Sequence, residues 1–128
     1  MDISEITIEG DTPGIAWRLP VFHFKGDDSR APTVYIQAAL HAGELPGTAL
    51  VHFLCERLRR AEAEGAIAGS LTIVPHANPI GLAQSHFGEL QGRFDLGSRA
   101  NFNRDFPLIP LEKRDTLLAD LGRFSATD

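Results

Sequence analysis

His41 and Glu44 are the residues whose types and spacing first suggest chemistry. They lie three positions apart in the sequence HAGE, which follows the apolar residues 33–40 and precedes Pro46. On a single turn, an imidazole nitrogen and a carboxylate oxygen can face one cation, and zinc accepts both at about 2 Å. A histidine at a strand end is also a common capping residue, so this short pattern predicts a metal site only together with further residues.

Further polar residues that could bind a substrate follow the next apolar segment. Asn78 begins the sequence NPIG, Arg93 lies in GRFD, and Asn103 and Arg104 lie in NFNRDFP. A neighbouring amide and guanidinium offer several hydrogen-bond donors in a fixed arrangement, which suits a carboxylate. The alternative interpretation is structural: the arginines of this segment only pair with its own acidic residues and hold a long loop in place.

These motifs, taken together, resemble those of a known family. HAGE, NPIG followed by GRFD, and NFNRDFP are similar, in the same order, to the motifs of the zinc carboxypeptidase-like hydrolases, and within them to those of the succinylglutamate desuccinylase/aspartoacylase family. The resemblance extends over about residues 34–107. It implies that His41 and Glu44 are the first two ligands of a catalytic zinc ion.

The same resemblance implies roles on the substrate side. Arg93 would polarise the scissile carbonyl and stabilise its oxyanion, while Asn103 and Arg104 would bind the carboxylate of the substrate. The implied activity is hydrolysis of an amide bond in a small N-acyl amino acid or a similar carboxylate-bearing substrate, by a zinc-dependent deacylase. A zinc carboxypeptidase acting on peptides is the alternative within the same class.

The sequence departs from the family pattern at the motifs themselves. Ala42 stands where glycine is frequent, and Asn101 and Phe102 replace the usual Asp and Leu. The change to Phe is a packing change. The loss of the aspartate carboxylate is expected to alter how Arg104 is oriented.

A larger departure concerns residues that the family takes from later in its chain. These are a third zinc ligand, a histidine, and a glutamate that acts as the general base. Here no histidine follows His86, and after Arg104 the only glutamate is Glu112, which suits a helix start. We therefore expect the 128 residues to be a single domain that forms the N-terminal part of a truncated catalytic domain.

Another residue of this chain could complete the site. His76 is the first candidate, because it lies at the end of the strand beside the one that delivers His41, and His86 is the second. His23 and His52 are expected to be structural. A hypothesis of a different class is a non-catalytic module that binds a carboxylate ligand or a protein partner.

The intervening residues predict the elements that position these side chains. Residues 33–40 are apolar on both faces, which is typical of a strand inside a parallel sheet. Residues 46–64 predict a helix with an apolar face of Leu50, Phe53, Leu54, Leu58 and Ala61. Residues 70–74 predict a second buried strand, so the order is that of a right-handed crossover between parallel strands.

Strands and a helix are also predicted outside this crossover. Ile6 and Ile8 alternate with polar residues before a glycine-rich turn, and residues 15–24 form the next strand, where Pro20 indicates an edge or a bulge. A last helix is expected over residues 112–124. The predicted fold is α/β, an open mixed sheet with flanking helices, similar to the zinc carboxypeptidase and phosphorylase-hydrolase folds.

Composition limits the classes of partner. The chain has 12 Lys and Arg against 17 Asp and Glu, a net charge of −5, and an acidic balance argues against nucleic-acid and anionic-membrane partners. No stretch approaches the roughly 20 apolar residues of a membrane span, and we expect a cytoplasmic location. Cys55 is expected to be a core residue. Unpaired edge strands predict self-association.

Overall fold

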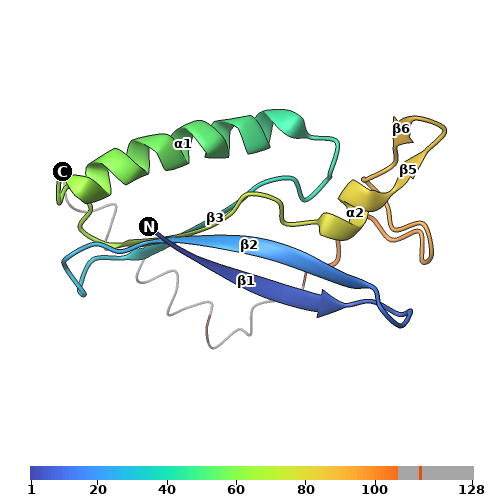
Figure 1. Ribbon diagram of the computed structural model, residues 1–128, viewed down its shortest axis with the longest axis horizontal. Coiled ribbons are helices and arrows are strands. Elements are labelled where there is room, and N and C mark those ends of the chain that lie inside the picture. Colours follow the sequence, from blue (N-terminus) through green and yellow to red (C-terminus); the bar gives the residue numbers. More distant parts are fainter. Residues whose placement is uncertain (107–112, 114–128) are drawn as a thin grey trace.

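The computed structural model describes residues 1–106 and residue 113. Its main body is a four-stranded mixed sheet with one long helix lying across one face (Figure 1). In the order in which they pair, the strands are β1 (Asp2–Glu9), β2 (Ala16–Phe24), β4 (Ser70–Val74) and β3 (Thr33–Gln37). This arrangement confirms the predicted α/β class and the open mixed sheet.

The two predicted N-terminal strands form an antiparallel hairpin. Ile6 pairs with Leu19, and the backbone N–H of Gly10 donates to the carbonyl oxygen of Ile15 at 2.9 Å, which closes the turn. Pro20 pairs with β1 only, because β4 pairs with β2 over Phe22–Phe24. The edge position predicted from this proline therefore holds for its part of the strand.

The predicted crossover is also confirmed. β3 and β4 are parallel neighbours, joined by α1 (Leu45–Ala63), which has Pro46 in its first turn. Gly65 follows the helix with a φ of +65°, a conformation that glycine adopts without strain. Since both strands run in the same direction, their carboxyl ends are adjacent, and the loops that follow them lie at the same end of the sheet.

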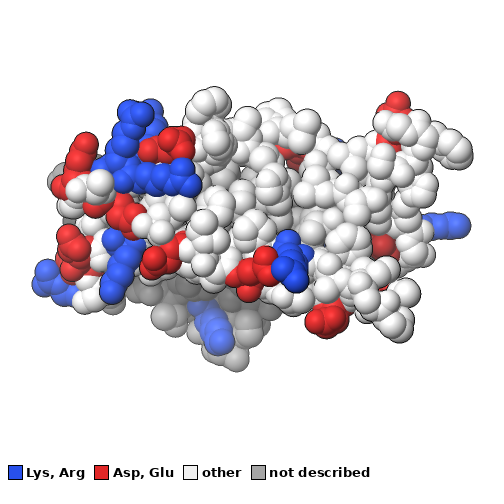
Figure 2. Space-filling view, in the orientation of Figure 1, with Lys and Arg blue, Asp and Glu red and all other residues white. Residues whose placement is uncertain are grey.

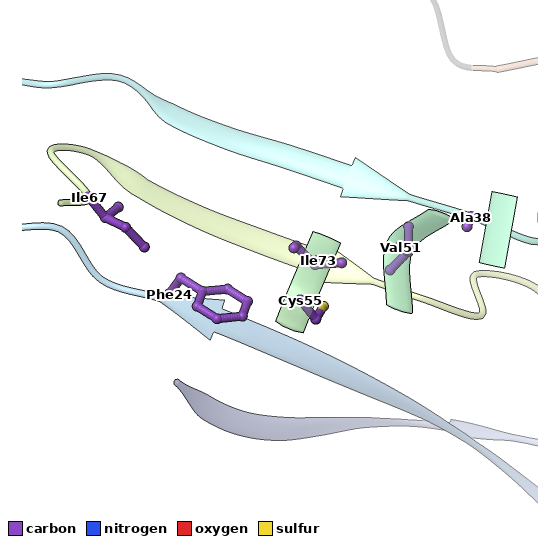
Figure 3. Close-up of a cluster of buried hydrophobic side chains, with 6 residues drawn as sticks. All are labelled: Phe24, Ala38, Val51, Cys55, Ile67 and Ile73. Atoms are coloured by element: carbon purple, nitrogen blue, oxygen red, sulfur yellow. The ribbon is translucent and has the colours of Figure 1, made fainter. Parts of the chain in front are cut away.

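The core lies between α1 and the sheet. Val51 and Cys55 of the helix pack over Phe24 and Ile73 of the strands (Figure 3). Burial raises the pKa of the Cys55 thiol, so this residue stays protonated at neutral pH, as expected of a core cysteine.

The predicted apolar face of α1 is wrong at two positions. Leu50 and Phe53 are 69% and 66% exposed, whereas Leu54, Leu58 and Ala61 pack against the core. The helix buries the row that includes Val51 and Cys55, since residues three and four apart share one face. Apolar residues occur on both sides of this row, so the spacing alone did not locate it.

The prediction that residues 33–40 form an interior strand is wrong for the part of the chain that the structure describes. β3 lies at an edge of the sheet, and Val34 and Tyr35 are 43% and 58% exposed. Apolar side chains on both faces indicate that a strand can be covered. The pattern does not show whether a neighbouring strand and helix are present to cover the strand.

The segment after β4 contains short elements. These are α2 (Pro79–Ala83) and a small hairpin of β5 (Ser85–His86) and β6 (Glu89–Leu90), which projects from one end of the sheet (Figure 1). The helix predicted over residues 112–124 lies outside the described residues, apart from Lys113. Within the described part of the chain, no helix is long and apolar enough to cross a membrane.

Candidate active site

The HAGE turn begins where β3 has ended and the chain leaves the sheet. Ala39 takes a φ of +56°, a conformation that costs a residue with a side chain about 1–3 kcal/mol. The following turn is closed by a hydrogen bond from the backbone N–H of Glu44 to the carbonyl oxygen of His41. The side chain of His41 is 6% exposed, whereas that of Glu44 is 58% exposed, so a buried imidazole and an open carboxylate face the same space.

The donor atoms of this pair converge as the sequence predicts. His41 Nδ1 lies 2.9 Å from Glu44 Oε1. Two atoms bound to one zinc ion at about 2 Å in tetrahedral geometry are about 3.3 Å apart, so a small movement would admit the ion. The atom types and their separation therefore fit two of the ligands of a zinc site.

Asn78 ties the ends of the two parallel strands together. Its side-chain Nδ2 donates to the carbonyl oxygen of Leu40 at 2.9 Å, and its Oδ1 accepts from the backbone N–H of Gly81 at 2.8 Å. Because Asn78 is buried and both of its polar atoms are used, it holds the residue before His41 against the start of α2. The NPIG motif is therefore structural.

Arg93 lies beside the same pair. Its Nη2 donates to Glu44 Oε1 at 3.0 Å, although the two residues are 49 positions apart. In the alternative interpretation given above, Arg93 would pair with an acidic residue of its own loop and would serve only to hold that loop in place. Its partner is instead Glu44, which is in the HAGE turn.

Close backbone packing brings Arg93 to this place. The backbone N–H of Ala42 donates to the carbonyl oxygen of Gly92 at 3.0 Å, and Ala42 is fully buried. A β-carbon at Gly92 would overlap that of Ala42, so only glycine permits this approach. The glycine of GRFD therefore sets the position of the arginine that follows it.

Asn101 joins the HAGE turn to the last motif. Its Oδ1 lies 2.8 Å from His41 Nε2 and accepts from the backbone N–H of Asn103 at 2.8 Å. The guanidinium of Arg104 donates to the carbonyl oxygen of Asn103. The sequence shows that Asn101 departs from the family pattern. It did not predict the contact between Asn101 and His41, because the two residues are 60 positions apart.

The predicted site residues divide into two groups. His41, Glu44 and Arg93 line one cavity of about 390 Å³, whose lining also includes Leu90 of the small hairpin. Asn103 and Arg104 do not line this cavity and are linked to it through Asn101. The structure thus brings together the metal pair and the predicted oxyanion residue, and places the predicted carboxylate-binding residues beside them.

The cavity favours a charged carboxylate at Glu44. The hydrogen bond with His41 holds the pKa of Glu44 below its ordinary value, and the positive charge of Arg93 acts in the same direction. Glu44 is therefore ionised at neutral pH, the form in which it can bind a cation.

A third ligand is not found among residues 1–106 and 113, where no three His, Cys, Asp or Glu side chains lie close enough to hold a metal ion. The hypothesis that His76 completes the site is wrong. This residue lines a different cavity, between α1 and β2, where its Nδ1 is buried. His86 is exposed on β5, and His23 contacts Ser4 and Thr72 within the sheet, as expected of a structural residue.

Two solved structures are similar to this chain. One is a succinylglutamate desuccinylase/aspartoacylase family protein from Shewanella amazonensis, with 30% identity and a TM-score of 0.76 over 94% of this chain and 34% of that chain. The other, from Shewanella frigidimarina, carries the same family name, with 29% identity and a TM-score of 0.75 over 92% of this chain and 31% of that chain. This chain therefore spans about a third of the length of these proteins.

Two further comparisons complete this result. None of the curated proteins matches the chain. The family model of the succinylglutamate desuccinylase/aspartoacylase catalytic domain matches residues 30–125, which include all three motifs. The chain therefore belongs to the succinylglutamate desuccinylase/aspartoacylase family.

Proposed function

We propose that this chain carries the metal-binding end of the active site of a zinc-dependent amidohydrolase that removes the acyl group from an N-acyl amino acid. The observation that carries the proposal is the convergence of His41 Nδ1, Glu44 Oε1 and Arg93 Nη2 in one cavity at the carboxyl end of β3. Ligands bind at this end of the strands in open α/β sheets. Family membership supports a deacylase rather than another zinc hydrolase.

In this proposal His41 and Glu44 hold the zinc ion. When bound there, zinc supplies a Lewis acid that lowers the pKa of a coordinated water toward neutrality and polarises a carbonyl group. Arg93 donates to the carbonyl oxygen of the substrate as negative charge develops on it. Arg93 is 54% exposed, so this contact would gain strength as the bound substrate displaces water, because a fixed cation stabilises charge more in a water-excluded site than in water.

Asn103 and Arg104 bind the carboxylate of the substrate in this proposal. The Arg104 guanidinium, which donates to the backbone carbonyl of Asn103, would give up that bond or share it with the carboxylate. The planar guanidinium fork suits a carboxylate and so orients the acyl group toward the metal pair. A third ligand and a general base are also required, and the relatives have about three times the length of this chain.

The test is hydrolysis of a panel of N-acyl amino acids by the gene product that contains this chain, loaded with zinc. The His41→Ala variant is expected to lose activity by roughly 100-fold or more, because a zinc ligand matters at least as much as its outer-shell partners. Phe53→Ala, on the exposed side of α1, is the control. Equal activity of His41→Ala and the parent would refute the proposal, and release of C-terminal residues from peptides would favour a carboxypeptidase.

A second candidate function is binding without catalysis. The two-ligand arrangement of the described residues favours it, because a catalytic zinc ion takes three ligands from the protein. The zinc content of the purified 128-residue chain separates the candidates. Near-stoichiometric, tightly held zinc would contradict the non-catalytic module, whereas weak zinc binding together with tight binding of a small carboxylate would support it.

A further inference from the structure

A second cavity lies between α1 and β2, on the side of the sheet that the helix covers. Its volume is about 330 Å³, and it shares no lining residue with the cavity that contains His41, Glu44 and Arg93. Protein interiors contain few voids larger than a water molecule, whereas ligand pockets begin at about 300 Å³. The second cavity is therefore large enough for a small ring compound, and it is separate from the candidate active site.

Two buried polar atoms without a partner belong to residues that line this cavity. Within the described residues, Thr48 Oγ1 on α1 and His76 Nδ1 after β4 are buried and make no hydrogen bond. Buried polar atoms are almost always paired, because an unpaired one has lost its hydrogen bonds with water and gained none from the protein. That both atoms belong to the lining of one cavity indicates that their partner lies inside it.

The other lining residues indicate what kind of molecule fits. Phe22 of β2, Val51 of α1 and Pro75 after β4 supply apolar surface. Glu56 and Arg59 also line the cavity, but Arg59 Nη1 donates to Glu56 Oε1 at 2.7 Å, and both side chains are about half-exposed. Because these two charges neutralise each other, they favour neither an anion nor a cation. Apolar walls with a few polar atoms are typical of sites for small neutral molecules.

The two unpaired atoms favour a hydroxyl group as their partner. A threonine hydroxyl both donates and accepts, and an imidazole nitrogen donates or accepts according to the position of the ring hydrogen. A hydroxyl group suits both atoms in either case, because it also donates and accepts. We propose that this cavity is a second ligand-binding site, which takes a small neutral ring compound whose hydroxyl group pairs with Thr48 and His76. The competing explanation is a bound water molecule.

Phenol and toluene are matched probes for this site, because they differ only in a hydroxyl group in place of a methyl group. The gene product that contains this chain is titrated with each compound, and saturable shifts of the Val51 methyl signals report binding in the cavity. Both compounds are expected to bind. Thr48→Val and His76→Leu should each weaken phenol binding by about 3–10-fold, the usual effect of one neutral hydrogen bond. Toluene binding should not fall in either variant, which would show that both variants fold and keep the cavity.

Thr7→Val, the same substitution at an exposed position of β1, is the matched control and should leave both affinities unchanged. Absence of saturable Val51 shifts with phenol would overturn the proposal in favour of a bound water molecule. Equal phenol affinity in the parent and in Thr48→Val would overturn it as well. Neither result bears on the hydrolysis of N-acyl amino acids, because no residue of this cavity is assigned to the metal pair or to the substrate.

Discussion

Single residues set the distances on which the site depends. Spacing within one turn is a local property, so the convergence of His41 and Glu44 could be predicted from the sequence. The partner of Arg93 could not, because its contact with Glu44 depends on how Gly92 packs against Ala42, 50 positions earlier in the chain. The glycine of GRFD was a signal in the sequence that the backbone packs closely at this position. The sequence did not indicate that Ala42 is the residue packed against it.

Gly92→Ala tests this packing. The added β-carbon overlaps that of Ala42, and overpacking of this kind costs about 1–3 kcal/mol. We expect a lower midpoint in urea unfolding and weaker contact between Arg93 and Glu44.

The double variant Ala42→Gly with Gly92→Ala is the matched control. It removes the β-carbon on the other side and should recover part of the lost free energy of unfolding. Equal stability of the single and double variants would show that the two residues do not meet as described.

At the scale of elements, the crossover was predictable and its buried face was not. A change of period from two to 3.6 residues, with Pro46 at the start and Gly65 at the end, indicates a helix between two strands. The face that the helix buries depends on how it is rotated against the sheet. Since apolar residues occur on both sides of the buried row, the sequence left this rotation open.

Two identical substitutions on α1 test its rotation. Leu58 packs against the core, whereas Leu50 is 69% exposed. Leu58→Ala is expected to lower the free energy of unfolding by roughly 1–3 kcal/mol, below the usual cost of a fully buried leucine because this one is only partly buried. Leu50→Ala should change it by less than about 0.5 kcal/mol. A larger loss at Leu50 in thermal or urea unfolding would contradict the described face.

At the scale of the whole molecule, charged side chains are unevenly distributed over the face shown in Figure 2. On the face shown in Figure 2, many charged side chains gather over the C-terminal end of α1, while the central surface is largely uncharged. The chain spans about a third of the length of its solved relatives, and β3 lies at a sheet edge of the described residues with Val34 and Tyr35 exposed. Sequence patterns could not predict this exposure, because it depends on the neighbours of a strand rather than on the strand.

The exposed edge leads to a prediction about association. A strand with unpaired backbone groups and apolar side chains can pair with another copy of itself. We expect the average mass of the 128-residue chain in light scattering to rise with protein concentration. Tyr35→Lys should reduce this rise, whereas Phe53→Lys on α1 should not. A constant monomer mass over the whole concentration range would contradict the prediction.

The proposal that His41 and Glu44 bind zinc is tested by anomalous diffraction, which locates zinc in crystals of the zinc-loaded gene product that contains this chain. We predict a zinc peak about 2.0–2.2 Å from Nδ1 of His41 and from a carboxylate oxygen of Glu44, beside the guanidinium of Arg93. A zinc peak that lacks either of these two ligands, or the absence of a peak in this cavity at saturating zinc, would contradict it.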